Sequence, residues 1–311
     1  MNIPPIVSRN FETLKVLSIL AVVAGHFFPQ TRLWLLSSIG LLIFGFSSGF
    51  FTAHLYGNAA ELRSFLLNKV RRLGPNLLVI NAFLLVLFLL RDAPGIWTWH
   101  SLIGIFGLTG WLNWLYIPNA SPFGNGLWFF TLLLIFYLLY PLLYRLLANS
   151  VRGYGLLLLL FLGSLWLSRL IPYGHMLWLT AFAFCFGVAY VTQRWQATLK
   201  DSGWLLAIAF LGVVFAGILL AASVLSSLII LAAWLLLLQL AMRWPFPVFL
   251  SAPLKFLAPC LLEIYFLHTY LFVRPTQMPL LDFCISLLVI AAVSLLLNRL
   301  AGRIRLGLRV Q

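Results

Sequence analysis

Apolar stretches of about 20 residues follow one another along most of this sequence, and few of them contain a charge. A helix of about that length crosses a bilayer core roughly 30 Å thick. Of the 311 residues, 63% are apolar and 8% are charged, whereas about 25% are charged in a typical soluble domain. A soluble fold of this size could not bury so much apolar surface. The pattern therefore predicts an integral membrane protein.

The predicted membrane protein is an all-α bundle. Only helices and closed barrels satisfy the backbone in lipid, and the period-two alternation of barrel strands is absent. We count about ten transmembrane helices, at 12–30, 33–53, 75–91, 127–146, 154–172, 174–193, 203–221, 223–242, 254–274 and 279–298. Two connections are long, from His54 to Gly74 and from Asp92 to Gly126. The second has the Trp-, Pro- and Gly-rich composition of an interfacial or re-entrant element.

The basic residues indicate the orientation of the bundle. With the N-terminus inside, ten spans place sixteen of the 20 Lys and Arg residues on the inner side and four on the outer side (Arg32, Arg91, Arg169 and Arg274). This asymmetry follows the positive-inside rule and predicts both termini in the cytoplasm. It accounts for most of the net charge of +14, so nucleic acid is not an expected partner. We expect a single transmembrane domain over residues 1–311, with no appended soluble domain.

Ionisable groups within spans are costly and mark candidate functional sites. The first span carries Lys15 and His26, which are 11 residues apart. That spacing turns an α-helix through about 1100°, close to whole turns, so the two side chains share a face at roughly 16 Å along the axis. Glu12, three residues before Lys15, is within reach of an ion pair. Either Lys15 and His26 are edge residues that reach the membrane surfaces, or His26 is a general base.

A basic cluster, Lys69, Arg71 and Arg72, precedes Pro75 on the predicted inner side. The guanidinium fork of arginine matches the geometry of a phosphate. The basic cluster is therefore either ordinary inner-side charge beside lipid headgroups or a binding site for a phosphate-bearing ligand.

The ninth span contains a carboxylate and a histidine. Glu263 and His268 are five residues apart, about 140° around a helix, so they do not share a face. A single carboxylate within a span needs a partner, and Glu263 is either part of a structural ion pair or part of the chemistry. His268 either makes an interhelical hydrogen bond or belongs to the site.

Four sequence motifs occur in order between residues 12 and 272. The first is ETLKVLSILAVVAGH (12–26), with Glu12, Lys15 and His26. The second joins FGFSSGFF (44–51) to FLLNKVRRLGP (65–75), and the small residues at 47–49 indicate close helix packing. The third is GLWFFTLLLIFYLLYP (126–141), and the fourth is LEIYFLHTYLF (262–272).

Together these motifs resemble the acyltransferase 3 family of integral membrane acyltransferases. The family has an acidic residue, a basic residue three positions later and, after ten intervening residues, a histidine. This chain has Glu12, Lys15 and His26 at these positions. The usual basic residue is arginine, so Lys15 keeps the charge but lacks the bidentate fork. Residues 150–255 carry no matching motif.

The resemblance implies transfer of an acyl group, usually acetyl, from cytoplasmic acyl-CoA to a hydroxyl, usually on a bacterial surface or secreted glycan. It implies a multi-pass protein of the bacterial inner membrane, with acetyl-CoA as donor and a glycan or lipid-linked saccharide as acceptor. No metal is expected, because the three cysteines lie in apolar runs without metal-ligand spacing. The expected site residues are His26 (general base), Glu12 and Lys15 for catalysis, Lys69, Arg71 and Arg72 for the donor, and Trp128, Tyr265 and His268 for the acceptor.

Two other functions remain open at this point. A transporter of a lipid-linked glycan or acyl carrier would also need many helices, but it favours inverted repeats and paired helix breaks, which the sequence does not show. A non-catalytic subunit of a glycan-assembly complex would keep the fold without the chemistry. The presence of both His26 and the basic cluster argues against that second alternative.

Overall fold

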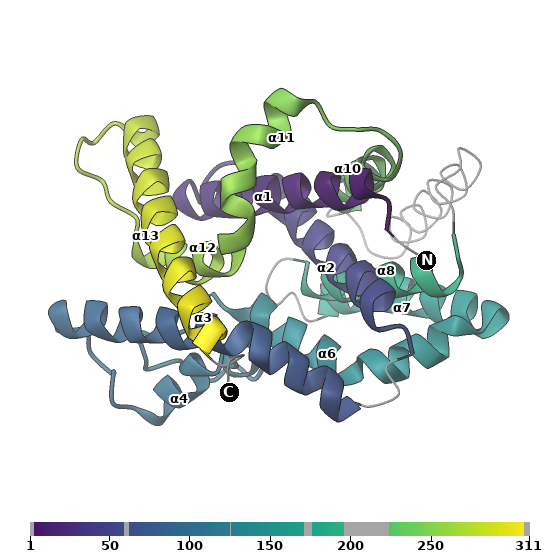
Figure 1. Ribbon diagram of the computed structural model, residues 1–311, viewed down its shortest axis with the longest axis horizontal. Helices are drawn as coiled ribbons and strands as arrows, with labels where there is room; N and C mark the ends of the chain where they lie inside the picture. The colour runs from purple at the N-terminus through teal and green to yellow at the C-terminus, as the bar shows by residue number, and fades with distance from the viewer. Residues whose placement is uncertain (1–2, 59–61, 125, 171–175, 196–223, 308–311) are drawn as a thin grey trace. The chain divides into compact units, whose positions relative to one another are not determined.

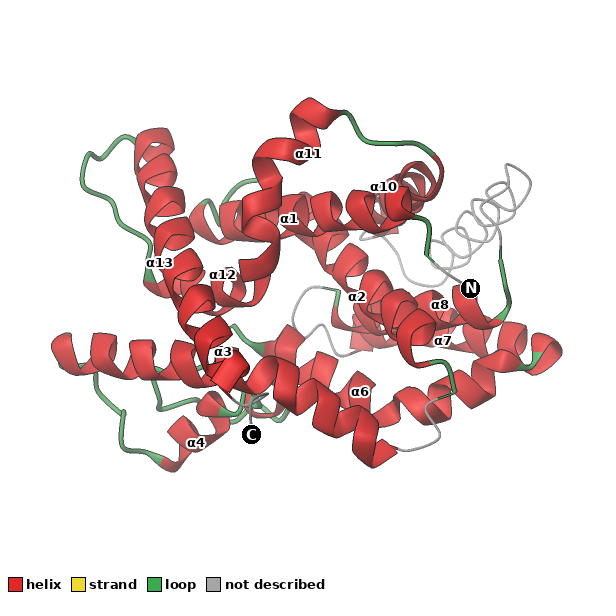
Figure 2. Ribbon diagram, viewed as in Figure 1, coloured by secondary structure: helices red, strands yellow, loops and turns green. Residues whose placement is uncertain are grey.

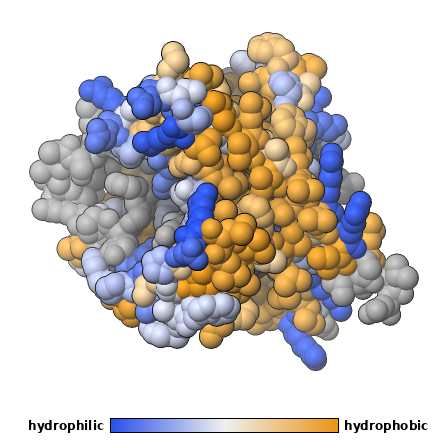
Figure 3. All heavy atoms as spheres, turned by 90° about the vertical axis from the view of Figure 1, so that its left-hand side faces the viewer, coloured by the Kyte–Doolittle hydropathy of each residue, from blue (hydrophilic) through white to orange (hydrophobic). Residues whose placement is uncertain are grey.

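The computed structural model describes residues 3–58, 62–124, 126–170, 176–195 and 224–307. These residues form helices and loops, with no strand among them (Figure 2). Six helical segments of the described residues are long and apolar enough to cross a membrane, and apolar residues cover much of the face drawn in Figure 3. The all-α membrane architecture is therefore confirmed. The count of ten spans and the cytoplasmic termini stay predictions, and the predicted span 203–221 lies outside the described residues.

The other predicted spans coincide with helical segments (Figure 1). Eight of them match one helix each: α1 (Pro5–Phe27), α2 (Trp34–Tyr56), α3 (Leu62–Leu90), α6 (Trp128–Ala148), α7 (Ser150–Leu170), α8 (Leu177–Thr192), α10 (Val224–Arg243) and α13 (Pro279–Gly307). The ninth predicted span, 254–274, is interrupted: it begins at the end of α11 (Val248–Leu254) and contains η1 (Lys255–Cys260), α12 (Leu261–Leu267) and η2 (His268–Tyr270). Pro253 and Pro259 lie within the interrupted part, where a missing N–H and a fixed φ disfavour a continuous α-helix.

The two long connections contain helices. α3 begins at Leu62, so the basic cluster lies on a helix rather than in the loop that the hydropathy indicates. This stretch is rich in Leu, Lys and Arg, which favour helix, and the helix continues through Pro75. A search for apolar stretches does not identify this part as helix, because it is polar although its backbone is helical. The outer connection contains α4 (Trp99–Ile105) and α5 (Thr109–Trp114).

The chain forms two compact units, described in turn. The first unit comprises Met1–Ala60 and Leu139–Ala258, and the second comprises Glu61–Leu138 and Pro259–Gln311. In the first unit, α2 packs against α1, α8 and α10, while α7 packs on α8 and α11 on α1. In the second unit, α3, α12 and α13 pack against one another.

The contact between α2 and α8 depends on glycine. A Cβ added at Gly49 would lie 2.1 Å from the backbone oxygen of Phe184, and one at Gly187 would lie 2.2 Å from that of Phe46. These distances exclude any side chain, so the two backbones approach directly. Small residues serve this purpose at helix interfaces in membranes. The close packing predicted from residues 47–49 is thus confirmed at Gly49.

A buried asparagine joins α1 to the end of α10. Asn10 is 0% exposed, and its Nδ2 donates to the backbone oxygens of Ala241 (2.9 Å) and Trp244 (2.8 Å). Its Oδ1 accepts from the N–H of Phe246 at 3.1 Å. A helix leaves its last carbonyls without intrahelical partners. Asn10 therefore satisfies the end of α10 and fixes α1 against it.

We expect Gly49→Ala to destabilise the protein by about 1–3 kcal/mol, because the added methyl forces α2 away from α8. Gly163 of α7 is the matched control, since a Cβ there meets no atom within 4 Å. Gly163→Ala should leave stability unchanged or slightly raise it, because alanine favours helix. Thermal unfolding of the detergent-purified variants measures both effects. Equal melting temperatures for the two variants would contradict the close approach.

Candidate functional site

The candidate catalytic residues of the first unit lie on one side of α1. The helix is continuous over Pro5–Phe27, so the spacing of Lys15 and His26 places them on one face, as predicted. Glu12 and His26 are exposed and Lys15 is half-buried, while the neighbouring Phe11 and Val16 are buried. We call this side of α1 the α1 site face.

Aromatic rings of α2 support the inner part of the α1 site face. The Nζ of Lys15 lies 5.1 Å from the centroid of the Phe51 ring, within the range of a cation–π interaction. The ring of Phe11 packs edge-on to Phe51 at 5.7 Å and is stacked on Phe46 and Phe50, each at 5.8 Å. The first and second motifs therefore form one aromatic cluster. Lysine suffices at position 15 for this contact, because a cation over a ring needs no bidentate fork.

His26 lies in the last turn of α1, beside a close contact with α2. A Cβ added at Gly25 would lie 2.3 Å from the Oγ of Ser37. That hydroxyl donates to the backbone oxygen of Ala21 at 2.9 Å. The turn between the two helices is therefore packed tightly next to His26, which fixes the backbone of the histidine.

The basic cluster divides into a buried and an exposed part. Lys69 is 6% exposed, and its Nζ lies 4.1 Å from the ring centroid of Tyr137 and 5.1 Å from that of Phe65. Arg71 and Arg72 are exposed. Lys69 and Arg72, three residues apart, share a face of α3, whereas Arg71 lies about 200° around the helix from Lys69. The arginines can therefore meet a ligand at the surface, while Lys69 is enclosed by aromatic rings.

The candidate acceptor residues lie together in the second unit. The hydroxyl of Tyr265 donates to the backbone oxygen of Gly126 at 2.9 Å, and its ring lies 6.0 Å from that of Phe129, the neighbour of the half-buried Trp128. His268 is 4% exposed, with Nδ1 2.8 Å from the backbone oxygen of Tyr265. Because Nδ1 donates to a carbonyl oxygen, the neutral ring carries its lone pair on Nε2. The structure thus brings the third and fourth motifs together.

Glu263 has partners that the sequence did not indicate. Its carboxylate is 0% exposed, and Oε1 accepts hydrogen bonds from the Nδ2 atoms of Asn76 and Asn298, the second at 3.1 Å. The Oδ1 of Asn76 in turn accepts from a terminal nitrogen of Arg305. We call these four residues the Glu263 network. Asn76 and Asn298 lie in predicted spans, where amides are costly, and that signal could have drawn attention to them.

The geometry of these motifs agrees with the comparison to known families. The model of an acyltransferase domain matches residues 9–299, nearly the whole chain. The chain belongs to the acyltransferase 3 family. No curated protein and no solved structure matches it. This member of the family is accordingly a multi-pass membrane acyltransferase.

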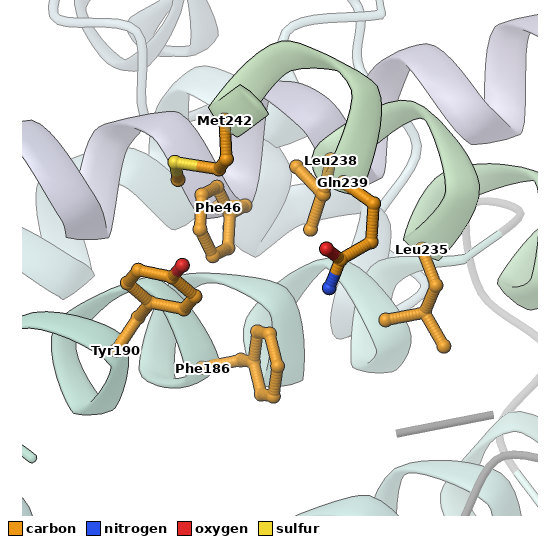
Figure 4. Close-up of a pocket in the computed structure, with 7 residues that line it drawn as sticks. All are labelled: Phe46, Phe186, Tyr190, Leu235, Leu238, Gln239 and Met242. Atoms are coloured by element: carbon orange, nitrogen blue, oxygen red, sulfur yellow. The ribbon is translucent and has the colours of Figure 1, made fainter. Parts of the chain in front are cut away.

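An acyltransferase needs room for an acyl group, and the first unit has a small cavity. The cavity is lined by Phe46 of α2, by Phe186 and Tyr190 of α8, and by Leu235, Leu238, Gln239 and Met242 of α10 (Figure 4). The amide of Gln239 points into this cavity, and its Oε1 has no hydrogen-bond partner within the described part of the chain. The space suffices for about one water molecule. In this conformation the cavity does not accommodate even an acetyl group.

The acyltransferase 3 family match carries no statement about a metal. Among the described residues, no group of three or more His, Cys, Asp or Glu side chains is placed to hold a metal ion. The expectation that this acyltransferase works without a metal stays a prediction.

We expect Tyr137→Leu to destabilise this acyltransferase by about 2 kcal/mol, because the Lys69 charge loses the ring that compensates for its burial. In the Lys69→Met background the same change should cost much less, since no charge remains to be compensated. Thermal unfolding of the wild type, the two single variants and the double variant gives the coupling energy. Additive effects would show that the ring does not stabilise the ammonium.

Proposed function

We propose that this protein transfers an acetyl or other small acyl group from cytoplasmic acyl-CoA to a hydroxyl of a bacterial surface or secreted glycan. Membership of the acyltransferase 3 family supports the acyl transfer. The observation that carries the finer assignment is the α1 site face, on which an exposed histidine shares one side of a continuous helix with Glu12 and Lys15.

Donor binding is assigned to the basic cluster. Acyl-CoA carries several phosphate charges, and the exposed guanidinium groups of Arg71 and Arg72 are suited to phosphate oxygens. Lys69 adds positive charge from beneath the surface, because its ammonium is held within the protein by Tyr137 and Phe65. Both arginines are thus available for direct contacts, Arg72 on the face of Lys69 and Arg71 about 100° around the helix from Arg72, and Lys69 contributes to the local potential.

The chemistry requires a base for the acceptor hydroxyl. His26 removes the hydroxyl proton while the oxygen attacks the carbonyl carbon of the thioester. The C–O bond forms, the C–S bond breaks, and the imidazolium returns the proton to the sulfur of CoA. The products are the glycan ester and free CoA, so no oxidant or reductant is needed. Glu12 and Lys15 orient the donor at the other end of the same helix face.

Acceptor binding is assigned to Trp128, Tyr265 and His268. An aromatic ring and polar groups side by side suit a sugar, which presents apolar C–H faces and hydroxyls. Tyr265 and His268 are both held by backbone carbonyl oxygens, which fixes the orientation of their polar atoms. Support for this part comes from their proximity and from the order of the motifs.

We expect His26→Ala to lower acyl transfer by roughly 10²–10⁴-fold, because the reaction loses its general base. Native membranes containing the protein are incubated with acetyl-CoA labelled in the acetyl group, and label in the glycan fraction is counted. His100→Ala is the control, since this histidine has no assigned role. A correctly folded His26→Ala protein with the parental rate would exclude the base. Flux of label into sealed vesicles without ester formation would indicate a transporter instead.

We expect Arg72→Ala to raise the KM for acetyl-CoA about tenfold or more, with a smaller effect on kcat, because a charge-assisted phosphate contact is lost. Arg63→Ala is the matched control: this arginine is also exposed on α3, but nine residues earlier and thus on the opposite side of the helix. Steady-state kinetics in the same membranes separate the two variants. An unchanged KM in Arg72→Ala would indicate that the basic cluster only provides inner-side positive charge that orients the protein in the membrane.

A further inference from the structure

The Glu263 network brings a further arginine to the basic cluster. Arg305 lies near the C-terminal end of α13, at the opposite end of the sequence from α3. A terminal nitrogen of its guanidinium donates to the Oδ1 of Asn76. The side chain is half-buried, and its Nε is buried without a hydrogen-bond partner in the described ranges. Asn76 thus fixes the position of Arg305 through one of its nitrogens, and the other N–H donors of the guanidinium do not bind Asn76.

Asn76, which holds this guanidinium, lies one helical turn from Arg72 on α3. Lys69, Arg72 and Asn76 are spaced i, i+3 and i+7, so they follow one face of α3. Residues four apart on a helix are neighbours, with Cβ atoms about 5–6 Å apart. The side chain of Arg72 is exposed beside the amide that holds Arg305. Two long guanidinium side chains can therefore converge on one anion at this place.

The carboxylate of Glu263 makes no direct hydrogen bond to the guanidinium of Arg305 among those that the structure shows. Its Oε1 takes its hydrogen bonds from two amides, and Arg305 is connected to it through Asn76. Its Oε2 has no hydrogen-bond partner among the residues that the structure describes. An arginine that served only as counter-ion to a buried carboxylate would gain most from a bidentate contact with both oxygens. In the structure Asn76 instead lies between them, accepting from Arg305 and donating to Glu263.

We propose that Arg305 is a phosphate-binding residue that acts with Arg72 on a phosphate of the acyl donor, and that Asn76 and Glu263 are its positioning residues. This inference rests on the proposed function. Two guanidinium groups supply several charge-assisted N–H donors, which match the oxygens of a phosphate group. A lipid headgroup offers the same phosphate chemistry, so the experiment has to separate the two sources.

The test measures the Kd of CoA, without any turnover, for protein in nanodiscs of neutral phosphatidylcholine and in nanodiscs that also contain phosphatidylglycerol. We expect Arg305→Gln to raise the Kd about tenfold in both, because one phosphate contact is lost. Arg303→Gln is the matched control, since it is exposed two residues earlier on the same helix, and its Kd should be unchanged. An unchanged Kd for CoA in Arg305→Gln would overturn the proposal, and loss in that variant of any effect of phosphatidylglycerol on the Kd would assign the site to lipid.

A counter-ion role is tested by the double variant Glu263→Gln/Arg305→Gln. If Arg305→Gln lowers the melting temperature by leaving the charge of Glu263 unpaired, the double variant restores the melting temperature, because it removes both charges. If Arg305 binds phosphate, the double variant keeps the raised Kd. Recovery of the wild-type Kd together with the melting temperature would show that Arg305 only balances Glu263.

The positioning role of Asn76 predicts that its effect depends on Arg305. Asn76→Ala should raise the Kd for CoA in the wild type but add nothing in the Arg305→Gln background. Additive effects would show that Asn76 does not act through Arg305. Absence of CoA binding by the wild type would exclude the donor and thus the proposed function, whereas equal binding by wild type and Arg305→Gln would exclude this inference alone.

Discussion

The direct backbone contact of α2 with α8 at Gly49 and Gly187 determines much of the arrangement within the first unit. It fixes the position of α2, whose phenylalanine rings pack against α1. Phe11 packs into those rings, and this contact sets the rotation of α1 about its axis. Phe11 faces inward, and Glu12 and His26 are exposed on the adjoining side of α1, where Lys15 lies against Phe51 of α2. A glycine contact between two other helices thus holds in place the rings against which α1 packs.

The second unit contains buried charged groups that need compensation. Taking a charge out of water costs several kcal/mol unless other groups compensate for it, on the order of 20 kcal/mol in the idealised limit. Lys69 is compensated by the faces of Tyr137 and Phe65, and Glu263 by two amide groups. These solutions share the face of α3 on which Lys69 and Asn76 lie. The same face therefore stabilises the unit and presents Arg72 at its surface.

Local periodicity made part of this arrangement predictable. The positions of the long apolar helices and the shared face of Lys15 and His26 follow from residue spacing alone, and the motifs pointed to the family. Contacts between distant segments could not be predicted in the same way. Asn76 and Glu263 are separated by 187 positions, and Asn76 and Arg305 by 229. The helical start of α3 was missed because hydropathy reports lipid-facing surface and does not report helix.

The basic cluster on α3 shows why adjacency in the sequence is a poor guide to a binding site. Sequence spacing groups Lys69, Arg71 and Arg72 as one cluster, but the helix turns Arg71 away from the face shared by the other two. Burial then removes Lys69 from direct contact with a ligand at the surface. Arg305, more than 200 positions away, is attached to that face by the amide of Asn76. The cations that can act on one phosphate are therefore selected by helix rotation and a buried amide, and adjacency in the chain decides little.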